Sequence, residues 1–142
     1  MTTVKQLLER KGRRVWSIRP DAPVLEALKL MAEHGVGALV VLEGERLAGV
    51  ISERDYARKV ILHGKSSSET PVREIMTARV VTVTPAQTVA DCMAVMTEKH
   101  FRHLPVVEDG RVVGVLSIGD LVKAVIAEQA DTIRALESYI HS

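Results

Sequence analysis

The chain has 142 residues, of which 46% are hydrophobic and 3% aromatic, and its formal net charge is +1. This length and hydrophobic content suffice for one compact domain with an aliphatic core, and the small charge argues against general affinity for nucleic acid or anionic membranes. A single cysteine, Cys92, excludes an internal disulfide and favours a reducing compartment. No apolar run approaches the roughly 18 residues that span a bilayer, and the N-terminal segment lacks the apolar run of a secretory signal. We therefore expect a cytoplasmic protein.

The first half of the chain predicts elements in the order β, α, β, β, α. An extended segment at 15–18 leads through a proline turn into a helix, and two apolar runs, beginning at 39 and ending at 51, flank a polar turn as in a hairpin. A last helix is expected after Ser52. The first helix has one apolar stripe with helical spacing, formed by Val24, Ala27, Leu28 and Met31.

The second half of the chain repeats the first. Residues 15–61 align without a gap onto residues 80–126, at a constant offset of 65 positions with about fifteen identities. Upstream, residues 4–8 resemble residues 72–76 at an offset of 68, so three extra residues lie between 9 and 14. One unit of about 50 residues buries too little surface to be stable alone. We therefore predict an α+β fold of two βαββα repeats with approximate twofold symmetry, whose two small sheets pack together and are flanked by helices.

Two serine–aspartate pairs break the apolar pattern at the same strand-to-helix junction of each repeat. They are Ser52 with Asp55 and Ser117 with Asp120. One interpretation is helix capping, in which both side chains satisfy free backbone amides. The other is a nucleotide site, because an ionised carboxylate accepts hydrogen bonds from both ribose hydroxyls, and a serine hydroxyl with helix N-terminal amides holds a phosphate.

Cationic side chains near these pairs are candidate phosphate ligands. Arg102 and His103 precede the second hairpin, and Arg102 offers planar donors with a fixed charge. The alternatives are a surface arginine and a histidine satisfied by the backbone. The first repeat has Gly37-Ala38 at these positions, so the halves are unequal. We expect Arg54, which stands where the second copy has Gly119, to supply the missing cation.

Three further side chains, His100, Cys92 and Trp16, are of types that can carry chemistry. His100 and His103 have a metal-like spacing but no obvious third ligand, so no metal site is predicted. Cys92 lies on the apolar stripe of its helix and is predicted to be a core residue rather than a nucleophile. Trp16 could stack on a base or pack in the core.

We divide the chain into repeat 1 (residues 4–63), repeat 2 (72–128) and a C-terminal helix (129–142). The last segment continues an apolar stripe that either folds back on the domain or contacts another subunit, and we favour the contact. The stripe comprises Ile126, Ala130, Ile133, Leu136 and Ile140.

The duplicated Gly-Val-Ile/Leu-Ser-x-x-Asp blocks, with Ile75-Met76-Thr77 and Arg102-His103-Leu104-Pro105-Val106-Val107, resemble the tandem cystathionine-β-synthase (CBS) domain family from residue 4 to about 127. The resemblance implies a Bateman module with two clefts for adenosyl ligands such as AMP, ATP or NAD(H), commonly assembled as a dimer. It also implies the roles of individual residues. Asp55 and Asp120 would bind the ribose, and Ser52 and Ser117 would bind either the ribose or a phosphate. Arg102 and His103 would bind the phosphate. The segments Ser17-Ile18 and Thr82-Val83 would line the adenine pocket. Arg54 and Gly119, inside the two Ser-x-x-Asp motifs, complete the predicted ligand-binding set.

The resemblance thus implies a regulatory, signal-transducing module that binds adenosine nucleotides, forms a homodimer and acts on a separate protein. We expect no enzymatic activity, no catalytic cofactor, and no nucleic-acid or membrane partner. One alternative is a structural dimerisation module with vestigial pockets. Another is a nucleotide hydrolase, which would need a metal cluster or an activated nucleophile.

Overall fold

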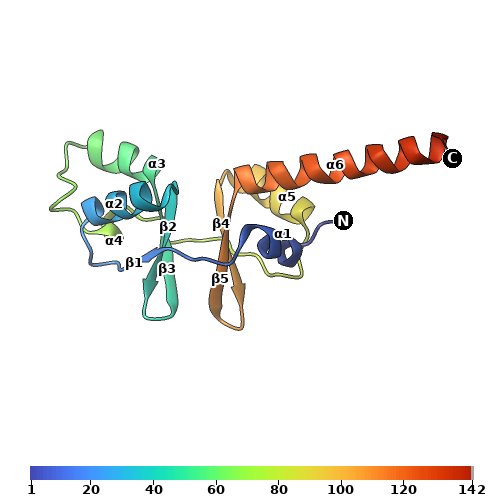
Figure 1. The fold of residues 1–142 in the computed structure, drawn as a ribbon. Coiled ribbons are helices and arrows are strands. Elements are labelled where there is room, and N and C mark those ends of the chain that lie inside the picture. Colours follow the sequence, from blue (N-terminus) through green and yellow to red (C-terminus); the bar gives the residue numbers. More distant parts are fainter. Residues whose placement is uncertain (142) are drawn as a thin grey trace.

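The computed structural model describes residues 1–141 and shows two similar halves side by side, with one long helix projecting from the second half (Figure 1). The first half of the chain contains α1 (Val4–Lys11), β1 (Ser17–Ile18), α2 (Val24–His34), β2 (Ala38–Glu43), β3 (Arg46–Ser52), α3 (Glu53–Tyr56) and the π-helix η1 (Ala57–Ile61). The second half contains α4 (Val72–Ile75), α5 (Val89–Lys99), β4 (His103–Glu108), β5 (Arg111–Ser117) and α6 (Ile118–His141). The predicted α+β class is confirmed, and the predicted order of elements recurs in both halves except for the first strand of the second repeat.

Each half has one antiparallel hairpin with the same register. Val40 faces Val50 in the β2–β3 pair, and Pro105 faces Val115 in the β4–β5 pair. The strand β1 adds to the first hairpin in parallel. Its counterpart in the second half is only a single parallel bridge between Val83 and Val106, so the predicted extended segment 80–83 is mostly irregular.

The short helices α1 and α4 are exchanged between the halves. Helix α1 begins repeat 1 in the sequence, yet its Val4, Leu7 and Leu8 are buried in the core formed by the rest of repeat 2. Helix α4 begins repeat 2, and its Val72 and Ile75 are buried in the core formed by the rest of repeat 1. A repeat in the sequence is therefore not a packing unit in space, and neither core is complete without a helix from the other half.

Backbone hydrogen bonds fix this exchange in the same way at both sites. The amide of Val4 donates to the carbonyl oxygen of Gln87 at 2.8 Å, and the amide of Val72 donates to that of Ala22 at 2.8 Å. These bonds join the start of each exchanged helix to the turn before α5 or α2. The two halves are thus tied together by paired main chains as well as by apolar burial.

The predicted C-terminal helix is the continuation of α6, which runs without a break from the second repeat to His141. Its apolar stripe does not fold back on the chain, because Ile126, Ile133, Leu136 and Ile140 are each more than half exposed. Within residues 1–141, none of the helices combines the length and the apolar character needed to cross a bilayer.

Candidate functional site

Two clefts contain the predicted carboxylates, and each cleft is assembled from both repeats. Cleft A, of about 520 Å³, joins the Ser52–Asp55 motif of repeat 1 to Arg102 and His103 of repeat 2. Cleft B, of about 470 Å³, joins the Ser117–Asp120 motif to Gly37 and Ala38 of repeat 1. Cleft A is also lined by Gly37, Val50, Glu53, Arg54, Arg58, Lys59, Thr77, Val80, Val81, His100 and Phe101. Cleft B is also lined by Lys11, Gly12, Arg14, Trp16, Gly35, Val36, His103 and Val115.

In cleft A, Asp55 caps its own helix and also contacts a cation. Its Oδ2 atom accepts hydrogen bonds from the amide of Ser52 at 2.9 Å and from the Ser52 hydroxyl at 3.0 Å. Its Oδ1 atom lies 3.4 Å from Nζ of Lys59, one turn further along. The side chain of Asp55 is 14% exposed. The capping interpretation is therefore correct, and it leaves the same carboxylate at the wall of a cleft.

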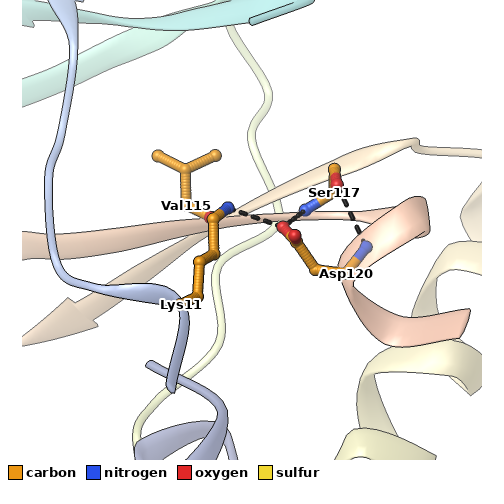
Figure 2. A network of polar contacts seen from close by, with 4 residues as sticks. All are labelled: Lys11, Val115, Ser117 and Asp120. Carbon is orange, nitrogen blue, oxygen red and sulfur yellow. Dashed lines mark hydrogen bonds and ion pairs between the residues drawn. The ribbon is translucent and has the colours of Figure 1, made fainter. Parts of the chain in front are cut away.

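In cleft B, Asp120 repeats the cap but takes its cation from a distant element (Figure 2). The amide of Ser117 donates to Oδ2 of Asp120 at 2.8 Å, and Nζ of Lys11 donates to the same oxygen at 2.5 Å. The same ammonium group donates to the carbonyl oxygen of Val115 at 2.5 Å. Lys11 is the last residue of α1, so the exchanged helix brings this cation to the carboxylate.

Lys11 also contributes to the pKa shifts of two side chains in cleft B. Burial would raise the pKa of Asp120, but the hydrogen bond from Lys11 and that from the Ser117 amide outweigh burial and lower the pKa below its ordinary value. The pKa of His103, which lines both clefts, is lowered chiefly by burial and then by the charge of Lys11. Asp120 is therefore held as the anion, while His103 favours its neutral form.

The structure corrects the predicted source of the cation in the unequal half. Arg54 lies in cleft A together with Arg102, and does not replace it in a second cleft. Cleft B instead receives Lys11 and Arg14. Both residues belong to the segment 9–14, which is three residues longer than its counterpart in repeat 2. The sequence shows this difference in length, but it does not show that the segment supplies cations to a cleft.

Five other predicted ligand residues lie outside the two clefts. Ile18 and Val83 are buried in the two cores, and Ser17 and Ile18 line a separate hollow with Arg19 and Arg73. Thr82 and Gly119 line neither cleft. In both predicted adenine segments the last side chain, Ile18 or Val83, turns into a core. The residues just before these segments, Trp16 in cleft B and Val80-Val81 in cleft A, line the clefts instead.

Trp16 packs at the edge of the first core and also reaches a cleft. Its ring stacks on the imidazole of His34, with centroids 3.5 Å apart and planes 6° apart, and it packs partly against the first core. It also lines cleft B. The indole therefore lies at the wall of the cleft that contains Asp120.

Cys92 lies in the second core, as predicted, and is fully buried. Burial, together with the charge of Asp91, raises the pKa of its thiol to about 11, which disfavours the nucleophilic thiolate. His100 and His103 both line cleft A. Among residues 1–141, no three His, Cys, Asp or Glu side chains are grouped so that they could hold a metal ion.

Comparison with known proteins gives a family for this fold. The family model described as "CBS domain" matches residues 4–62 and residues 72–127. The chain belongs to the CBS domain family. Its two clefts are the clefts of a CBS domain pair.

Relatives and solved structures agree with this membership. The mitochondrial CBS domain-containing protein CBSX3 of Arabidopsis thaliana is 42% identical, over 98% of this chain and 72% of its own. A protein with CBS domains from Burkholderia ambifaria, whose name suggests a role in signal transduction, is 52% identical with a TM-score of 0.86, over 90% of this chain and 96% of its own. Because one relative is mitochondrial, the cytoplasmic location stays a prediction.

A further solved structure of a CBS domain pair contains ligands. The pair from MJ0100 was solved in complex with 5′-methylthioadenosine and S-adenosyl-L-methionine. It is 25% identical to this chain with a TM-score of 0.80, over 90% of this chain and 98% of its own. Both ligands contain adenosine.

Proposed function

We propose that this CBS domain pair binds adenosine nucleotides in clefts A and B and thereby regulates a separate protein. The observation that carries the proposal is that Asp55 and Asp120 line equivalent walls of two clefts. Both carboxylates cap their own helices and are largely buried. The adenosine ligands of the MJ0100 pair support the same ligand class.

The ligand fits the clefts in size and in chemistry. Volumes of about 520 and 470 Å³ fall in the range of small-molecule sites. Each carboxylate uses Oδ2 for its cap, so Oδ1 is the atom we assign to the ribose hydroxyls. In cleft A, Arg54 and Arg102 are the proposed phosphate ligands, and the base is assigned to the side of Val80-Val81. In cleft B, the base is assigned to Trp16.

Regulation follows from the way the clefts are built. Each cleft takes one wall from repeat 1 and another from repeat 2, so a bound nucleotide bridges the two repeats. Such a ligand shifts a conformational equilibrium only as far as its affinity differs between the two arrangements. We infer that AMP, ATP or NAD(H) changes the relative packing of the halves, and that a partner protein responds to that change.

We further propose that the exposed stripe of α6 pairs with a second copy of the chain. The stripe from Ile126 to Ile140 is extended towards the start of the helix by Ile118 and Val122, which are also exposed. An exposed apolar surface of this length is unusual for a monomer. A twofold pair would bury the same face of each copy.

Binding is tested first with the whole chain. Isothermal calorimetry with AMP, ATP, NAD⁺ and NADH is expected to give saturable binding, and a ligand at 100 times its dissociation constant should stabilise the protein by about 2.7 kcal/mol. Mass spectrometry of small molecules that co-purify identifies the natural ligand. If no adenosine compound binds, the carboxylates are only caps and the structural dimerisation module is the better description.

Catalysis is tested separately. Incubation with ATP and Mg²⁺ is expected to return ATP unchanged, because the proposal assigns the clefts to binding. Sustained release of ADP or AMP would replace the regulatory proposal by a nucleotide hydrolase.

A further inference from the structure

We propose that Lys11 sets the ligand specificity of cleft B, so that this cleft prefers adenosine ligands carrying an anionic group at the 5′ position over neutral nucleosides. The inference rests on the proposed function and concerns which adenosine compounds cleft B selects.

The position of Lys11 is fixed by two acceptors inside the cleft wall. Its Nζ atom lies 2.5 Å from Oδ2 of Asp120 and 2.5 Å from the carbonyl oxygen of Val115 (Figure 2). The side chains of Lys11 and Asp120 are 37% and 20% exposed, so the carboxylate is more buried than its lysine partner. An ammonium group has three donors. The third is left for a ligand in the cleft.

Cleft A contains more cationic side chains than cleft B. The side chain of Lys59 makes similar contacts there, with Asp55 at 3.4 Å and with the carbonyl oxygen of Ile75 at 2.9 Å. Three more fixed charges, Arg54, Arg58 and Arg102, line the same cleft. In cleft B, the lysine and arginine side chains in the lining are Lys11 and Arg14.

Because Lys11 lies in cleft B, the charge of the ligand's 5′ group should affect the affinity of this cleft. The ribose is assigned to Oδ1 of Asp120, whereas Lys11 donates to Oδ2, so a bound nucleoside leaves this ion pair in place. A nucleoside monophosphate also gives the third donor of Lys11 an anion. A neutral nucleoside gives it none. Cleft B should therefore discriminate between AMP and adenosine, which share the base and the sugar.

The single tryptophan of the chain allows cleft B to be observed alone. Trp16 lines cleft B and does not line cleft A. We would titrate AMP and adenosine into the wild-type protein and into Lys11→Met, and follow Trp16 fluorescence. The wild type is expected to bind AMP at least tenfold more tightly than adenosine. In Lys11→Met, the binding of AMP should weaken and the binding of adenosine should not. The ratio of the two dissociation constants should therefore fall close to one.

Two further variants separate this role from general electrostatics and from damage to the fold. Lys11→Arg keeps the charge and should keep the preference for AMP. Lys123→Met removes an equal charge from an exposed position on α6 outside both clefts, and it should leave the ratio unchanged. Thermal unfolding of each variant shows whether the fold is intact.

The titrations distinguish a failure of the proposed role of Lys11 from a failure of nucleotide binding as a whole. An unchanged AMP-to-adenosine ratio in Lys11→Met, or an equal loss of both ligands, would overturn the inference and leave nucleotide binding in place. Calorimetric binding without any change in Trp16 fluorescence would confine the ligand to cleft A and also overturn it. Absence of binding by both methods in the wild type would remove the proposed function itself.

Discussion

Leu8 packs against the backbone of Gly114, so closely that a Cβ atom added at residue 114 would lie 2.6 Å from Cδ2 of Leu8. Leu8 is fully buried and belongs to α1, whereas Gly114 lies in β5 of the other repeat. The contact is therefore part of the helix exchange. The same relationship recurs at Gly49, where an added Cβ would lie 2.7 Å from the carbonyl oxygen of Thr77.

We predict that Gly114→Ala destabilises the protein by about 1–3 kcal/mol, because the added methyl group overpacks a core site. Gly119→Ala is the matched control. An added Cβ there has only an ordinary contact, 3.6 Å from Oγ of Ser117, and alanine favours a helix over glycine. Urea unfolding of both variants measures the difference. Equal stability of the two would show that α1 does not press on β5 as described.

A second prediction separates the capping role of Asp120 from its role in binding. Asp120→Ala removes the carboxylate and should weaken nucleotide binding in cleft B roughly ten- to hundredfold, since hydrogen bonds to a charged group contribute about 1.5–3 kcal/mol. Ser117→Ala removes the hydroxyl that caps the amide of Asp120 at 3.2 Å but keeps the carboxylate. Both variants should lose about 1 kcal/mol of stability as helix caps.

Fluorescence titration and denaturant unfolding of the same two samples distinguish these roles. Binding should fall much further in Asp120→Ala than in Ser117→Ala. Equal binding losses in the two variants would mean that Asp120 acts only through its helix.

The third prediction concerns pH and His103. Burial, Lys11 and Arg102 lower its pKa in the folded protein, while Asp120 and Asp55 act in the opposite direction without restoring it. The unfolded chain therefore binds more protons than the folded chain between the lowered pKa and the ordinary value of about 6.5. In that window stability rises with pH, so acidification from about pH 6.5 should destabilise the protein.

The free energy of unfolding of wild type and His103→Gln, measured at several values between pH 7.5 and pH 5, checks this sign. The wild type should lose stability relative to His103→Gln as the pH falls. His63→Gln, at an exposed position, serves as the control for loss of an imidazole. A stability difference between wild type and His103→Gln that does not vary with pH would contradict the assigned environment of His103.

The repeat, the secondary structure and the two carboxylates could be predicted from the sequence because they depend on local pattern and duplication. The partners of those carboxylates could not. Alignment at a fixed offset places Arg102 opposite Gly37, as equivalents. The fold instead places Arg102 beside Asp55, and Gly37 between both clefts, because each cleft crosses from one repeat to the other.

The contact between Lys11 and Asp120 could not be predicted from the sequence for a related reason. The distance between the two residues along the chain is large, and only the exchange of α1 onto the second core brings them together. The extra residues between 9 and 14 marked the place where the repeats differ in length. A length difference alone does not indicate which side chain it delivers, or to which cleft.

The last prediction tests the proposed second copy on α6. A charged side chain in a buried apolar contact is costly unless it is paired. Ile133→Glu and Leu136→Glu, at positions 55% and 58% exposed in the single chain, should therefore dissociate the assembly. Ala135→Glu lies between them in sequence but on the opposite side of the helix, so it should leave the assembly intact. Light scattering coupled to size-exclusion chromatography gives the mass of each species. A wild-type mass of one chain would refute the contact, and a wild-type dimer that survives both stripe substitutions would place the interface on another surface.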